Sequence, residues 1–262
     1  TPPSRWAAAL GAIRTGLRTH SGDGDAGALI PGMVLGDTSK QTAEFKDQMK
    51  RSGLTHLVAV SGANLAIVMG AVYFLTAALG LARNFRFTLA LVCMGMYVLL
   101  VGPESSVLRA ATMATFVLLG IWIGRRTNPL VSLSWAIIFL LSVDPGLAVD
   151  FGFGLSATAT AGLVLLASRW FEALRTRLPN WLALGIAASA SAQLWTTPIL
   201  LMLQPSLPLY AVFANLLVEP VVAPVTVLGI AAVSVVGVIP LLSQLLTLLA
   251  SLGTFWITVV AG

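Results

Sequence analysis

Residues 209–237 read LYAVFANLLVEPVVAPVTVLGIAAVSVVG, and this stretch decides the fold class. It holds one charged residue, Glu219, and is longer than the roughly 20 apolar residues that a helix needs to cross a bilayer. Pro220 and Pro224 lie inside it, so we expect a helix that is broken near the prolines. Such a break is tolerated in a membrane only where the freed backbone groups face protein or a water-filled cavity. The stretch therefore predicts a membrane-spanning segment beside a polar space.

The rest of the chain beyond Leu54 has the same apolar character. Of the 262 residues of the whole chain, 57% are hydrophobic and 10% are charged, whereas soluble domains carry about 25% charged residues. Lipid is therefore the expected solvent. The predicted fold class is all-α, a polytopic integral membrane bundle of helices. We expect about eight hydrophobic segments, at residues 54–82, 87–101, 107–123, 130–143, 151–168, 181–203, 209–237 and 241–261.

The first 53 residues are more polar and predict short amphipathic helices. One apolar stripe recurs at helical spacing, formed by Trp6, Leu10, Ile13 and Leu17. A helix of this kind lies at a membrane surface or packs on a further soluble domain. Residues 21–27 (SGDGDAG) predict a flexible turn. A second helix is expected from Thr38, by its capping-box spacing to Gln41, to Arg51, with Gly53 ending it.

The charges between the segments predict the orientation of the chain. Loops after the first, third and fifth segments hold seven basic residues, namely Arg83, Arg86, Arg125, Arg126, Arg169, Arg175 and Arg177. The alternate loops hold Glu104, Asp144 and Asp150 instead. Basic loops stay in the cytoplasm. We therefore expect a multi-pass protein of the cytoplasmic (inner) membrane, with an external juxtamembrane part at 1–53, a transmembrane domain at 54–262 and both termini outside.

The sequence contains few patterns of residues that are typical of an enzyme's active site. One cysteine and two histidines cannot build a Cys/His zinc site, so we expect no metal and no cofactor. Serine catalysis needs a base within hydrogen-bond reach of the hydroxyl. His56 lies five residues before Ser61 on the same predicted helix and would face elsewhere. Ser61 and Gly62 are more typical of close helix packing. The sequence also lacks the G-x-x-x-x-G-K-[ST] pattern of a phosphate-binding loop.

A few polar side chains interrupt the apolar segments, and each ionisable one costs about 3 kcal/mol or more. They are Arg109, Asp150 and Glu219, with the amides Asn64, Gln193 and Asn215. Two interpretations are open. Arg109 could pair with Glu104 or Asp150, Asp150 could cap a helix, and the amides could join helices. Alternatively, the same side chains could line a polar path.

Six stretches, in this order, resemble blocks of the competence domain of the ComEC family. They are ALIPGMVLGD (28–37), RSGLTHLVAVSGANLAIV (51–68), SSVLRAATMA (105–114), DPGLAVDFGFGLS (144–156), AQLWTTPILL (192–201) and ANLLVEPVV (214–222). That domain is the inner-membrane channel for DNA uptake in natural transformation. One departure is Asn64, where the family often has a histidine.

The resemblance implies a channel domain that passes single-stranded DNA across the membrane. Its polar lining would comprise Ser61, Asn64, Arg109, Gln193, Asn215 and Glu219, with Asp37 and Asp150 at the outer entrance. The partners implied are external OB-like and nuclease domains of the same full-length protein and a cytoplasmic DNA translocase, and a homo-oligomer is left open. The competing functions are a secondary transporter for a small anion and a scaffold that anchors external domains.

Overall fold

The computed structural model describes residues 5–58, 60–102, 104–125, 127–203 and 210–262. Within these ranges the chain is helical and contains no strand. The helices are α1 (Arg5–His20), α2 (Gly24–Leu35), α3 (Ala43–Arg51), α4 (Gly62–Ala78), α5 (Arg83–Val101), α6 (Ser105–Trp122), α7 (Pro129–Val143), α8 (Phe151–Gly162), α9 (Ser168–Leu174), α10 (Asn180–Leu203), α11 (Ala211–Val235) and α12 (Pro240–Ala261). A π-helical turn, Leu163–Ala167, joins α8 to α9.

Each of the eight predicted segments contains a helix. Six helical runs are long and apolar enough to cross a membrane: α5, α6, the run from α8 to α9, α10, α11 and α12. The apolar helices α4 and α7 are shorter, with 17 and 15 residues. The prediction of a helical, multi-pass membrane protein is therefore confirmed. The sides of the membrane on which the termini lie stay a prediction.

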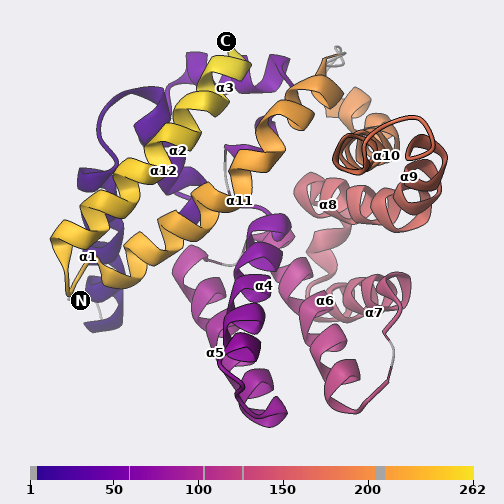
Figure 1. Cartoon of the computed structure of the whole chain (residues 1–262), viewed down its shortest axis with the longest axis horizontal. Helices are drawn as coiled ribbons and strands as arrows, with labels where there is room; N and C mark the ends of the chain where they lie inside the picture. The colour runs from indigo at the N-terminus through magenta and orange to yellow at the C-terminus, as the bar shows by residue number, and fades with distance from the viewer. Residues whose placement is uncertain (1–4, 59, 103, 126, 204–209) are drawn as a thin grey trace.

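The break expected in α11 is not present, because the helix runs without interruption from Ala211 to Val235 with Pro220 and Pro224 inside it. A proline removes one backbone hydrogen bond and crowds the preceding turn, which bends a helix when packing holds both halves in place. Here α12 packs antiparallel along α11, and Figure 1 shows α11 changing direction along its course. Gly253 of α12 allows this close approach, since a side chain there would meet Val221 and Val225.

The flexible turn expected at residues 21–27 is shorter than predicted, because α2 begins at Gly24. Every residue from Gly27 to Leu35 is buried, against α11 and α12 among others. This burial outweighs the turn preference of the Gly and Asp residues, as tertiary packing commonly does for local propensity. Gly229 of α11 makes room for Val34 of α2.

The helix predicted from Thr38 begins later, at Ala43. Thr42 is its N-cap, and the Thr42 hydroxyl accepts a hydrogen bond from the backbone N–H of Phe45 at 3.1 Å. The far end agrees with the prediction. The helix ends at Arg51, and Gly53 follows with a φ of +76°, a conformation that glycine adopts without steric cost.

One hydrophobic core joins the N-terminal part of the chain to its last two helices. Leu17 of α1, Met33 of α2 and Phe45 of α3 belong to the same buried cluster as Val218 of α11 and Ile257 of α12. The boundary at residue 53 stays a prediction, but α1 packs on helices of its own chain. A second cluster lies between α4, α5 and α6.

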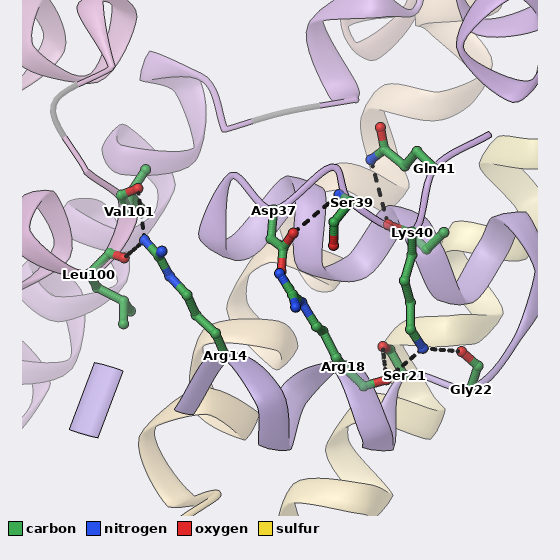
Figure 2. A network of polar contacts seen from close by, with 11 residues as sticks. Arg14, Arg18, Ser21, Gly22, Asp37, Ser39, Lys40, Gln41, Leu100 and Val101 are labelled. Carbon is green, nitrogen blue, oxygen red and sulfur yellow. Dashed lines mark hydrogen bonds and ion pairs between the residues drawn. The ribbon is translucent and has the colours of Figure 1, made fainter. Parts of the chain in front are cut away.

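Two arginines of α1 attach this helix to other parts of the fold (Figure 2). Arg14 donates to the carbonyl oxygens of Leu100 and Val101, at 3.1 and 3.4 Å. These carbonyls end α5, where a positive charge is favourable. Arg18 forms an ion pair with Asp37, just after α2. The network thus connects α1 with the ends of α2 and α5.

The charge of Asp37 is stabilised by its neighbours. Burial alone would raise the pKa of Asp37, but hydrogen bonds from Arg18 and from the backbone N–H of Ser39 outweigh burial and hold this pKa below its ordinary value. A carboxyl group whose pKa is lowered by folding stabilises the fold above its unfolded-state pKa. That contribution is lost as the pH falls through the folded-state pKa.

We expect Asp37→Asn to lower the free energy of unfolding by about 1 kcal/mol at neutral pH, a modest figure because Arg18 is partly exposed. Thermal unfolding in detergent across a pH series measures it. The difference between the two proteins should shrink as the pH falls below the ordinary range of a carboxyl group. The matched control is Asp47→Asn, which removes an exposed pair with Arg51 and should change little. A pH-independent difference would contradict the assignment.

We expect Gly229→Leu to reduce the yield of folded protein, because the new side chain would overlap Val34 and push α2 away from α11. Overpacking of this kind costs about 1–3 kcal/mol. Size-exclusion profiles of detergent-extracted protein measure the folded fraction. Gly95→Leu is the control, since a side chain at Gly95 of α5 would meet nothing within 4 Å. Equal yields for both variants would show that the approach of α2 to α11 is not required.

Candidate functional site

Arg109 on α6 is the one cation of the predicted polar lining, and only 5% of its surface is exposed. Its Nη2 and Nε donate to the hydroxyl of Ser156 on α8, at 2.7 and 3.0 Å. Nη1 lies 3.1 Å from the sulfur of Met113. In the part of the chain that the structure describes, Arg109 pairs with no carboxylate. The ion pair with Glu104 or Asp150 that the sequence left open is therefore not formed there, and neutral groups surround the guanidinium.

The guanidinium of Arg109 lies against the first residue of α4, Gly62. A Cβ atom at Gly62 would sit 3.2 Å from Nη2 of Arg109 and 2.9 Å from Cβ of Ala110. Ser61 is the N-cap of α4, with its hydroxyl 3.4 Å from the backbone N–H of Asn64. The sequence prediction of close packing is confirmed at Gly62. His56 lies in the separate short helix η1 (Thr55–Leu57), so its placement on the helix of Ser61 was wrong.

Two sources of positive potential meet at this point. The N-terminus of a helix carries a partial positive charge from its free N–H groups, and the first turn of α4 has no acidic residue to offset it. Arg109 adds a full charge that is removed from water and left without a counter-ion. A buried charge without a partner costs several kcal/mol. The arrangement can therefore receive an anion, with the hydroxyl of Ser156 beside the guanidinium.

Asp150 caps a helix near Arg109 and does not pair with the guanidinium. Its Oδ1 accepts from the backbone N–H of Phe153 at 2.5 Å, which caps α8, and from the hydroxyl of Ser105 at 3.1 Å. Ser105 is the first residue of α6. Asp150 thus ties the starts of α6 and α8 together, and this holds Ser156 next to Arg109. The side chain is exposed, and no contact joins it to the guanidinium.

Asn64 connects two helices. It is 1% exposed, and its Nδ2 donates to the carbonyl oxygen of Met33 at 2.8 Å. Met33 lies in the last turn of α2, where carbonyl groups lack partners within the helix. The Oδ1 atom of Asn64 has no hydrogen-bond partner among the described residues. Asn64 therefore serves as a helix-joining amide, which leaves one polar atom unsatisfied.

The other predicted lining residues lie apart from Arg109. Gln193 on α10 and Asn215 on α11 are half-buried, and Glu219 on α11 is exposed. No hydrogen bond of these three side chains occurs within the described ranges. Asp37 is held by Arg18, as described above. The structure thus places Ser61 and Asn64 at the start of α4, whose first residue Gly62 lies against Arg109, and the lining role of all these residues stays a prediction.

Ser156 and Ser105, which hold Arg109 and Asp150 in place, were not predicted from the sequence. Both lie inside the quoted motifs, each as a small polar residue within an apolar region. Their hydroxyl groups could have been singled out as the hydrogen-bonding groups nearest to the charged residues. Arg14, which holds the end of α5, was not singled out from the sequence either.

Comparison with known proteins gives a consistent result. The model of the family described as Competence protein matches residues 33–262. ComE operon protein 3 of Bacillus subtilis (strain 168) is 28% identical over 196 residues, which is 75% of this chain. The chain spans about a quarter of the length of that relative. No solved structure matches the chain. The match over most of its length shows that the chain belongs to the Competence protein family.

Proposed function

We propose that this domain passes single-stranded DNA across the cytoplasmic membrane during natural transformation. Family membership connects the chain with competence and DNA uptake. The six candidate spans supply a membrane body through which a strand could move. Because the chain equals about a quarter of its relative, other parts of a longer protein would supply external OB-like and nuclease domains. A separate cytoplasmic DNA translocase would supply the driving force.

The observation that carries the proposal is the buried guanidinium of Arg109 beside the start of α4. A phosphate group of the DNA backbone is an anion that would offset both positive charges at once. Arginine N–H groups and the first N–H groups of a helix both suit phosphate oxygens. The hydroxyl of Ser156, now bound to Arg109 at 2.7 Å, would turn toward the anion or release the guanidinium to it.

A single cationic centre also suits passage better than a row of them. Each phosphate that a protein neutralises strengthens binding to nucleic acid, and a conducting path must let its cargo leave. Asn64, Gln193 and Asn215 would contact bases or sugars without sequence preference. The carboxylate of Glu219 would repel phosphates and so limit how long the strand stays. Glu219 is exposed on an apolar helix, so it would face either a wet path or a second copy of the chain.

A transporter for a small anion is the second candidate function. The same centre favours it, because Arg109 lies in a closely packed place where Gly62 touches Ala110 and the guanidinium. A small anion needs less rearrangement of α4, α6 and α8 than a strand does. The two functions differ in what competes for Arg109. Free phosphate or sulfate should inhibit the transporter at low concentration, whereas DNA passage should be affected only through the general action of salt.

We expect Arg109→Gln, made in the full-length protein, to lower transformation frequency by at least tenfold while the protein still inserts into the membrane. The charge that meets phosphate is lost, although glutamine can still bond Ser156. Arg109→Lys keeps the charge but not the forked geometry, and should retain an intermediate frequency. The measurement is transformation of a competent strain that lacks its own family member.

The control for Arg109 is Arg169→Gln, which removes an exposed basic residue of α9 and should leave transformation unchanged. Membrane abundance of each variant is measured by immunoblot. Normal transformation in Arg109→Gln would overturn the proposed role. Loss of transformation together with unchanged DNA entry, but with impaired uptake of labelled phosphate into vesicles, would support the transporter instead.

We expect Gln193→Leu to leave the folded fraction unchanged, because no described hydrogen bond of the Gln193 side chain is lost. It should reduce transformation by several-fold if the amide contacts the passing strand. Size-exclusion profiles and transformation frequency are measured on the same variant. A loss of folded protein would assign Gln193 to helix packing, and unchanged transformation would remove it from the path.

A further inference from the structure

A small apolar hollow lies where α4 and α6 end and α5 begins, away from Arg109. Figure 1 shows the three helices running to this same end of the molecule. The hollow is lined by Tyr73, Arg83, Phe87, Leu118, Ile121 and Trp122. Phe87 and Trp122 stack on each other, with ring centroids 5.4 Å apart and planes 18° from parallel. One wall of the hollow is therefore an aromatic pair that joins α5 to α6.

Two arginines, Arg83 and Arg86, lie at this hollow, and a third, Arg125, comes three residues after its lining residue Trp122. Arg83 is the first residue of α5, and it is exposed. Arg86, one turn later, lies over the ring of Tyr73 with its guanidinium carbon 5.9 Å from the ring centroid. Its Nε donates to the carbonyl oxygen of Leu81 at 2.7 Å. Arg125 follows α6 and is also exposed. Arg83 lines the hollow and Arg86 lies over its Tyr73 ring, so these two side chains place positive charge at the rim of an apolar depression.

No acidic side chain balances these charges within the described residues. The ion pairs found there involve Asp37, Asp47 and Glu172. The first turn of α5 has no acidic residue either. Glu104 is the next carboxylate along the chain, and it lies at the opposite end of α6. The rim therefore offers several N–H donors to an anion from outside the chain.

We infer that this end of α4, α5 and α6 is a binding site for an anionic phospholipid. The phosphate of the headgroup would meet Arg83 and Arg86. The hollow itself has a volume of about 10 Å³ and is too small to enclose an acyl chain, so the chain would lie along the exposed apolar side chains of the same helix ends, such as Phe74 and Ile123. Basic pockets between membrane helices bind anionic headgroups in this way. Arginine and tryptophan are also typical of the level at which headgroups lie.

The surroundings favour a lipid over a nucleic acid. Large apolar side chains next to the hollow are exposed, with Phe74 at 76% and Ile123 at 64%, as expected of residues that meet acyl chains. A base of single-stranded DNA would need a free aromatic face. Phe87 and Trp122 cover one face of each other, and Arg86 covers one face of Tyr73. These contacts leave less ring surface for bases, but they leave the cationic rim open to a headgroup.

The test is native mass spectrometry of the purified protein in detergent with equal amounts of phosphatidylglycerol and phosphatidylcholine. The wild-type protein should retain phosphatidylglycerol in at least fivefold preference. The double variant Arg83→Gln/Arg86→Gln should lose that preference. Arg83→Gln alone keeps the bond of Arg86 to Leu81 and so serves if the double variant does not fold. The single variant Arg83→Gln should reduce the preference for phosphatidylglycerol by about half or more.

The matched control is Arg169→Gln/Arg177→Gln, which removes two exposed arginines that are not among the residues lining the hollow. It should keep the full preference. Three results would overturn the site: no preference in the wild-type protein, an equal loss in the control, or displacement of phosphatidylglycerol by a single-stranded oligonucleotide that binds through Arg83 and Arg86. The last result would assign the rim to nucleic acid.

Discussion

The fold depends on one constraint, the need to satisfy polar groups internally when lipid is the solvent. Three polar side chains find hydrogen-bond partners on other helices, whereas Gln193, Asn215 and Glu219 form no side-chain hydrogen bond within the described ranges. Arg109 of α6 donates to the hydroxyl of Ser156 on α8. Asp150 accepts from the hydroxyl of Ser105 on α6 and from the backbone N–H of Phe153 on α8, and Asn64 of α4 donates to the carbonyl oxygen of Met33 on α2. These bonds set which helices adjoin, and the apolar packing fills the space between them.

Apolar content and segment length were enough to predict the membrane helices, because a bilayer leaves few alternatives to a helix of about 20 residues. The sequence could not predict α2. Its Gly and Asp residues favour a turn locally, and only the burial of Gly27–Leu35 by the last two helices makes it helical. Similarly, Pro220 and Pro224 signal a break in α11, but contact with α12 keeps that helix continuous.

In the candidate site, too, some features could be predicted from the sequence and others could not. Rarity in an apolar segment was a sufficient signal for Arg109 and Asn64, since both are buried and form contacts between helices. It was not a sufficient signal for their partners. Long-range hydrogen bonds such as Arg109 to Ser156, 47 positions apart, depend on how α6 and α8 cross. The same limit applies to Asp37, whose Arg18 partner lies in a helix that looked independent of the membrane part.

The docking of α1 and α2 has a practical consequence. The family match begins at residue 33, inside α2. A protein trimmed to the matching residues would lose Leu17, Leu29 and Ile30, which are fully buried. It would also lose the arginine that covers the terminal carbonyls of α5. The apolar surface of α11 and α12 would then be exposed to detergent or to other copies of the protein. Aggregation of such a shortened protein would therefore result from the loss of α1 and part of α2, and not from a defect of the family domain.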